Sequence, residues 1–362
     1  MKLTAESGLW STGSLTAPPP LVAVLEVSGA VLAWPVGDPG TGDPVITFTD
    51  HRRADWLWRV VGEAGHVAVV EALAQRDSKQ PVEMAGVATL PVPVAALRRL
   101  AMGHWLRRWW PASERDGILA LDRAVLDAEI ALLTVGAEDY FSDDTIDSDV
   151  HGLLLPHVAT LNTLAAEGDP RITELVERCR ELADEIGLAW TESARAPRRA
   201  DYALAAGAAD ASVADAVIGR GVATVNWSAV PPGVFDAAED TVGWTVVPAG
   251  SAVNAHVQVA LAGPGQPDGI AVNLRCGEYH GAAVLDAAGR AVFQVLDAGG
   301  QPLDETPAWN QDWSAAVVSV GVSGAGESEH TRTRVRELAR ARLATPGEDA
   351  YLAEVLAAES DY

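Results

Sequence analysis

The chain has 362 residues, a hydrophobic content of 48% and a formal net charge of −24, because 50 acidic side chains outnumber 26 lysines and arginines. Its length favours two or three domains, and its apolar content excludes disorder of the whole chain. A charge of this sign opposes binding to nucleic acid or to an anionic membrane surface, since both recruit basic proteins.

The N-terminal part is predicted to form a small α+β domain. Residues 1–20 end in a run of prolines and are expected to be a flexible lead-in. Residues 21–92 contain valine-rich stretches, turn formers and a short helix that Asp50 can cap. This helix carries Trp56 and Trp58, which cannot share one helical face. One tryptophan is therefore expected to contact a neighbouring domain or a partner, unless each makes a separate core contact.

Residues 93–190 follow a helical period and predict a central helical domain. The stretch 97–110, LRRLAMGHWLRRWW, contains four arginines and three tryptophans. Its helix is expected to end at Pro111, which cannot continue it. A second helix is expected to begin at Ser113, where Asp116 completes a pattern resembling a capping box, and to run to Val135.

The second helix is expected to place Asp122 and Glu129 on its apolar face. A buried carboxylate is costly unless it is paired or bound to metal. Arginines of the preceding helix are the expected partners; a metal site and shallower burial are the alternatives. The residues assigned this structural role are Arg98, Arg107, Arg108, Asp122, Glu129, Trp105 and Trp109.

Residues 124–170 contain ten acidic side chains and no lysine or arginine. An EF-hand is excluded because neither Asp143 nor Asp147, taken as the first ligand, places the required glutamate at the twelfth position. A solvated acidic loop, a docking surface for a basic partner and a looser divalent-cation site remain open. The partner-binding candidates are Glu138, Asp139, Asp143, Asp144, Asp147 and Asp149. The candidate metal ligands are Asp143, Asp147, Asp149 and His151.

The C-terminal half changes architecture. Residues 191–214 are predicted to be a linker, and residues 215–324 contain seven short β-rich runs that predict an antiparallel, immunoglobulin-like β-sandwich. Residues 325–362 are predicted to form terminal helices. The first of these is rich in arginine and is expected to fold back onto the chain's own acidic surface or to dock with a partner. The predicted fold class is thus multidomain α+β.

Motifs for catalysis are absent from the sequence: there is no glycine-rich phosphate loop, His-Glu-x-x-His, nucleophile elbow or zinc-like cysteine spacing. We therefore expect no cofactor and favour binding over catalysis. Cys179 and Cys276 are expected to be buried free thiols. No leader pattern or apolar window of about 20 residues occurs, so a cytoplasmic location is expected.

The leading functional hypothesis is a non-enzymatic adaptor or scaffold that binds other proteins, with basic surfaces, through its acidic surface. One alternative is a divalent-metal-dependent hydrolase that uses the acidic cluster at residues 138–157. Another is a small-molecule binding protein with a pocket lined by Trp105, Trp109 and Trp110. The sequence leaves the oligomeric state open.

Overall fold

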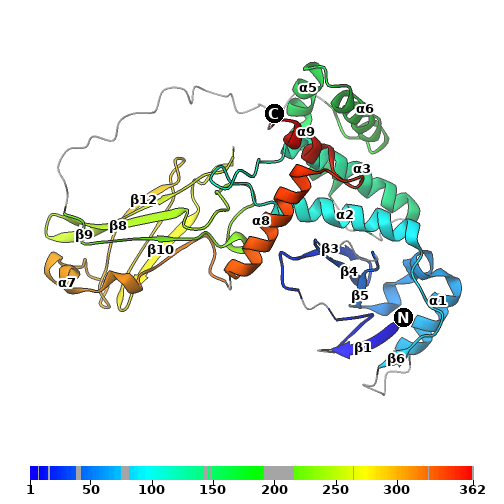
Figure 1. The fold of residues 1–362 in the computed structure, drawn as a ribbon, viewed down its shortest axis with the longest axis horizontal. Coiled ribbons are helices and arrows are strands. Elements are labelled where there is room, and N and C mark those ends of the chain that lie inside the picture. Colours follow the sequence, from blue (N-terminus) through cyan, green and yellow to red (C-terminus); the bar gives the residue numbers. More distant parts are fainter. Residues whose placement is uncertain are drawn as a thin grey trace. The chain divides into compact units, whose positions relative to one another are not determined.

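The computed structural model describes residues 1–6, 8–14, 17–37, 42–74, 81–141, 146, 149–190, 216–263, 265–324 and 326–360. They form a mixed α+β structure with antiparallel sheets (Figure 1). The chain divides into two compact units. Unit 1 comprises Met1–Arg108, Leu121–Ala196 and Arg340–Tyr362, and unit 2 comprises Trp109–Ala120 and Pro197–Ala339. Each unit is therefore built from segments that are distant in the sequence.

Unit 1 begins with a six-stranded antiparallel sheet in the order β3-β4-β5-β2-β1-β6. Its strands are β1 Lys2–Glu6, β2 Leu9–Ser11, β3 Val22–Val27, β4 Ala30–Pro35, β5 Val45–Phe48 and β6 Val82–Glu83. In β3, Leu25 and Val27 are buried whereas Val24 and Glu26 are exposed, which is the period of a strand with one face on a core. The prediction of a flexible lead-in is wrong for the described part of residues 1–20, because β1 pairs with both β2 and β6.

Three helical elements follow: η1 His51–Arg53, η2 Asp55–Leu57 and α1 Trp58–Ala74. As predicted, the Asp50 side chain caps the first of them by accepting a hydrogen bond from a backbone amide. Helix α1 is broken at Gly62, whose φ of 73° lies in the left-handed region that favours glycine. Trp56 is buried and donates its indole N–H to the Ser28 carbonyl, whereas Trp58 is exposed. Two separate core contacts are therefore excluded, and the contact of one tryptophan with a neighbouring domain or a partner stays a prediction.

The rest of unit 1 is helical. Its elements are α2 Pro91–Trp109, α3 Arg123–Phe141, α4 Val150–Leu154, η3 Leu155–His157, α5 Val158–Ala166, α6 Pro170–Glu185 and α9 Leu352–Ser360. Helix α3 contacts α4, α5, α6 and α9 and is buried around most of its circumference. It is therefore the central helix of this part of unit 1.

The predicted helix start at Ser113 is wrong, because α3 begins at Arg123. Ser113 pairs with Ile118 in an isolated antiparallel bridge, and Gly117 between them has a φ of 65°. The Ser113 hydroxyl accepts a hydrogen bond from the Asp116 amide at 2.9 Å. In a capping box, the serine hydroxyl accepts the same hydrogen bond from the amide three residues later. Here this hydrogen bond closes a turn instead of starting a helix.

Unit 2 contains two antiparallel sheets, in the orders β12-β9-β8-β7 and β11-β10-β13 (Figure 1). The strands are β7 Gly219–Ala223, β8 Val242–Ala249, β9 Ala252–Val259, β10 Ala271–Cys276, β11 Tyr279–Val284, β12 Arg290–Gln294 and β13 Val317–Val320. Each predicted β-rich run overlaps one of these strands. Trp244 and Val257 of the first sheet share one hydrophobic core with Leu274 and Val318 of the second.

Shorter elements complete unit 2: η5 Trp227–Ala229, α7 Glu305–Asn310 and η6 Trp313–Ala315. The arginine-rich helix is α8, Glu329–Ala344. Within unit 2, the Ser113 hydroxyl donates to Asp236 Oδ1 at 2.6 Å, and both residues are buried. Cys179 of unit 1 and Cys276 of unit 2 are buried free thiols, as predicted.

Candidate functional site

A buried ion cluster joins α2 to α3 around Asp127, whose side chain is 1% exposed. Its Oδ1 and Oδ2 atoms accept hydrogen bonds from Arg107 Nε and Arg123 Nε, each at 2.9 Å. His157 Nε2 lies 3.1 Å from Oδ2. Burial alone would raise the pKa of Asp127, but the hydrogen bond with His157 and the charges of Arg123 and Arg107 outweigh it and lower that pKa. Arg107 thus pairs with a carboxylate of the next helix, and that carboxylate is Asp127.

The two acidic residues expected on the apolar face of this helix differ in their surroundings. Asp122 is exposed at the start of α3, where it accepts a hydrogen bond from the Val125 amide at 3.0 Å, so its predicted burial is wrong. Glu129 is half-buried, lies 3.6 Å from Arg99 and accepts a hydrogen bond from the Leu352 amide at 2.6 Å. Burial raises the pKa of Glu129 to about 7, against the opposing effects of that amide and Arg99.

Trp105 is a core residue of unit 1. It is buried and donates its indole N–H to the Pro20 carbonyl at 2.5 Å. Arg98, Arg108, Trp109 and Trp110 of the 97–110 stretch are half-buried. Trp105 and Arg98 belong to unit 1, whereas Trp109 and Trp110 belong to unit 2.

The acidic candidates are only partly within the described residues, because Asp143, Asp144 and Asp147 lie outside them. Glu138 is half-buried and Asp139 is exposed in the last turns of α3. Asp149 caps α4 by accepting a hydrogen bond from the Gly152 amide at 2.8 Å, and His151 is exposed. In the part of the chain that the structure describes, no three histidine, cysteine, aspartate or glutamate side chains gather as a metal site.

An exposed aromatic stack lies at the same end of α3. The Trp58 and Tyr140 side chains are 42% and 40% exposed, respectively. The Arg59 guanidinium lies 4.6 Å from the Trp58 ring centre and 5.4 Å from that of Tyr140. The Tyr140 hydroxyl donates to the Arg59 carbonyl at 3.2 Å. Behind the stack, buried Phe141 meets Trp56 edge to face at 6.2 Å between ring centres.

The stack brings together two features that the sequence analysis treated separately. Tyr140 directly follows Glu138 and Asp139, so the exposed tryptophan lies beside the start of the acidic segment. We call the stack of Trp58, Arg59 and Tyr140, together with Glu138 and Asp139 that directly precede Tyr140 in α3, the aromatic–acidic surface. Tyr140 and Arg59 were missed because their contact joins positions 81 residues apart. The spacing of Trp56 and Trp58 was the sequence signal that pointed here.

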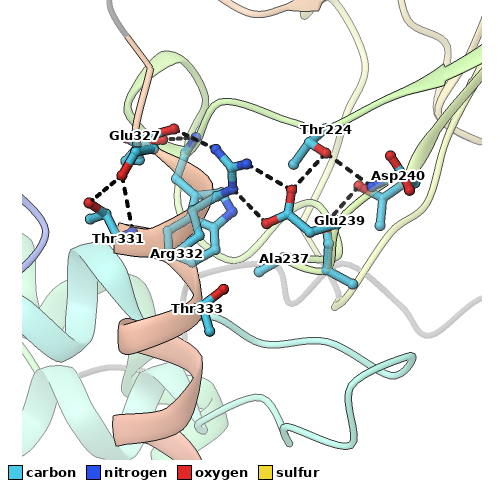
Figure 2. Close-up of polar contacts among 12 residues, drawn as sticks. Thr224, Ala237, Glu239, Asp240, Glu327, Thr331, Arg332 and Thr333 are labelled. Carbon is cyan, nitrogen blue, oxygen red and sulfur yellow. Dashed lines mark hydrogen bonds and ion pairs between the residues drawn. The ribbon is translucent and has the colours of Figure 1, made fainter.

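A second ion cluster lies within unit 2 and fixes the first part of α8 (Figure 2). Glu239 accepts hydrogen bonds from Arg332 at 2.7 and 2.8 Å, from Arg336 at 2.9 Å and from the Thr224 hydroxyl at 2.9 Å. Burial acts to raise the pKa of Glu239, but these hydrogen bonds lower it to about 2. Two arginines of the basic helix therefore pair with an acidic residue of the same chain.

No described helix combines the length and the apolar character needed to cross a lipid bilayer. Comparison of the chain with protein-family models, curated proteins and solved structures gives no match.

Proposed function

We propose that the chain is a non-enzymatic adaptor that binds a protein partner with basic side chains through the aromatic–acidic surface of unit 1. The observation that supports this most directly is the exposure of Trp58 and Tyr140, whose rings both lie close to the Arg59 guanidinium. Tryptophan, tyrosine and arginine are the residues that most often dominate binding energy in protein interfaces. Their combination on one surface is therefore a physical reason to expect a partner.

The charge of the neighbouring residues suggests the chemistry of the partner. Asp139 is exposed next to Tyr140, and the chain carries a net charge of −24. Such a surface accelerates the approach of basic proteins and disfavours acidic ones. The rings supply apolar area that loses water on binding, so a partner segment should combine cationic and apolar side chains.

The proposal includes the expectation that unit 2 is an immunoglobulin-like sandwich that serves as a binding or spacing module. Its support is that two antiparallel sheets share one hydrophobic core. Such modules commonly serve binding, although the fold alone does not define a function.

A fluorescent peptide that alternates arginine and leucine tests the surface directly. We expect fluorescence anisotropy to show saturable binding to the full chain that weakens as salt rises, because the charge contribution is screened. Trp58→Ala should weaken binding about tenfold or more, since a hot-spot side chain contributes about 2 kcal/mol. Asp139→Asn should reduce the salt dependence.

Trp309→Ala is the matched control, because Trp309 is a 48% exposed tryptophan of α7 in unit 2. Its indole N–H donates to Glu305 at 3.0 Å, and it lies outside the aromatic–acidic surface. A peptide alternating glutamate and leucine should not bind. Equal binding by the wild-type protein, Trp58→Ala and Trp309→Ala would contradict the proposal.

A further inference from the structure

A pocket of about 330 Å³ lies within unit 1, where α2, α3, α6 and α9 meet. Its wall combines an apolar part with charged groups. The apolar residues are Leu132, Leu133, Leu175 and Leu352, and the charged residues are Arg99, Glu129, Arg171, Glu174 and Arg178. Its volume is at the lower end of the range for small-molecule sites. Three guanidinium groups therefore line this pocket, together with two carboxyl groups.

Two of these arginines retain unused hydrogen-bond donors. Arg171 is occupied, since Asp169 and Glu359 accept hydrogen bonds from its terminal nitrogens at 2.7 to 2.8 Å. The Nε atom of Arg99, by contrast, is buried and has no hydrogen-bond partner among the described residues. Arg178 is exposed and, within the described part of the chain, forms neither a hydrogen bond nor an ion pair.

Arg99 is held in place although its donors are not all used. Its guanidinium lies 5.4 Å from the ring centre of Tyr351, which is fully buried. Glu129 lies 3.6 Å from Arg99, which is longer than a hydrogen bond, and its other oxygen accepts the Leu352 amide. Because burial raises the pKa of Glu129 to about 7, this carboxyl group only partly neutralises Arg99 near neutral pH.

We propose that this pocket binds a small aliphatic carboxylate, with its carboxylate between Arg99 and Arg178 and its hydrocarbon chain against the leucines. Guanidinium groups match the planar geometry of a carboxylate and can bind it through two parallel hydrogen bonds. The exposed parts of the Arg99 and Arg178 guanidinium groups line the pocket, so their N–H groups can donate to an incoming carboxylate. The leucine wall favours an aliphatic acid over inorganic phosphate, which has no apolar surface to bury. The inference is independent of the aromatic–acidic surface.

The test compares four probes at matched ionic strength: hexanoate, acetate, inorganic phosphate and hexylammonium. We expect hexanoate to raise the thermal unfolding midpoint of the full chain in a saturable manner, because a ligand that binds only the native state stabilises it. Acetate and phosphate should act much more weakly, and hexylammonium should have no effect. Calorimetric titration then gives the dissociation constant for hexanoate.

Arg178→Gln should weaken hexanoate binding about tenfold, the usual effect of removing one charge-assisted hydrogen bond. Arg180→Gln is the control, since Arg180 is exposed on the same helix, donates to Asn162 at 2.7 Å and does not line the pocket. Both positions are exposed, so both variants should fold. The proposal is overturned if hexanoate does not bind, if phosphate binds as tightly as hexanoate, or if the two variants bind hexanoate equally.

Discussion

At the scale of single residues, Asp127 should be the most sensitive position of the helical part of unit 1. Asp127→Ala removes the shared partner of Arg107, Arg123 and His157. Breaking a buried ion pair typically costs about 3–5 kcal/mol; we expect about 3 kcal/mol because both arginines are half-exposed. Urea unfolding measures this loss, and Asp149→Ala, which removes only a helix cap, should cost about 1 kcal/mol. Equal losses would show that the cluster adds little.

The lowered pKa of Asp127 also predicts a dependence on acid. Its contribution to stability is fully present above the ordinary aspartate pKa of about 4 and is lost as pH falls through the lower pKa of the folded state. Wild-type protein should therefore lose stability steeply below about pH 4. In Asp127→Ala this acid-induced loss should be smaller, which urea midpoints measured from pH 5 to pH 2.5 would show.

Glu129 has the opposite effect on the pH dependence. Its pKa is raised to about 7, so the folded state binds a proton more tightly than the unfolded state does. Its contribution is therefore greatest at low pH and falls as pH rises from about 4.5 to 7, by roughly 2 kcal/mol between pH 5 and pH 8. Glu129→Gln cannot titrate and should lack this decline in the free energy of unfolding. An identical decline in the variant would assign the effect to other groups.

At the scale of elements, two helical glycines offer a matched comparison. A Cβ atom on Gly103 of α2 would overlap the Tyr351 hydroxyl and lie 2.8 Å from Ile130 Cγ1. Alanine gains about 1 kcal/mol in helix propensity, but overpacking costs about 1–3 kcal/mol. Gly103→Ala should therefore destabilise unit 1 and increase hydrogen exchange in α9, which directly follows Tyr351.

Gly136 of α3 is the control for this substitution, because a Cβ atom there would meet nothing within 4 Å. Gly136→Ala should stabilise the protein by up to about 1 kcal/mol, the propensity gain alone. Thermal unfolding of the two variants should thus shift in opposite directions. If both variants shifted the unfolding midpoint in the same direction, the close packing of Gly103 against Tyr351 would not be what holds α9 against α2.

Helices and strands could be predicted where the pattern of apolar residues repeats without interruption. The strands of unit 2 were found because short β-rich runs alternate with turn formers, and α2 was found because Pro111 limits it. The start of α3 was missed because Ser113 and Asp116 make the same local hydrogen bond in a turn as in a helix cap. Asp127 was missed because α3 is buried on most sides, so no single apolar stripe marks its core-facing residues.

At the scale of the whole molecule, the sequence predicted a multidomain α+β chain but could not reveal that Trp109–Ala120 belongs to unit 2. Membership of that segment depends on contacts such as Ser113 with Asp236, which leave no periodic signal. Only part of the aromatic–acidic surface could be predicted. Its acidic residues are contiguous in the sequence, whereas the contact of Arg59 with Tyr140 joins positions 81 residues apart. Long-range contacts decide both features, and local patterns do not encode them.

The discontinuity of unit 2 has a consequence for biosynthesis. Ser113 precedes its partner Asp236 by 123 residues. At about 5–20 residues per second, translation separates them by roughly 6–25 s. During this interval the ribosome produces helices α3 to α6 of unit 1. The first segment of unit 2 is therefore made before most of the strands of that unit, and Ser113 can bond to Asp236 only after these four helices of unit 1 have been synthesised.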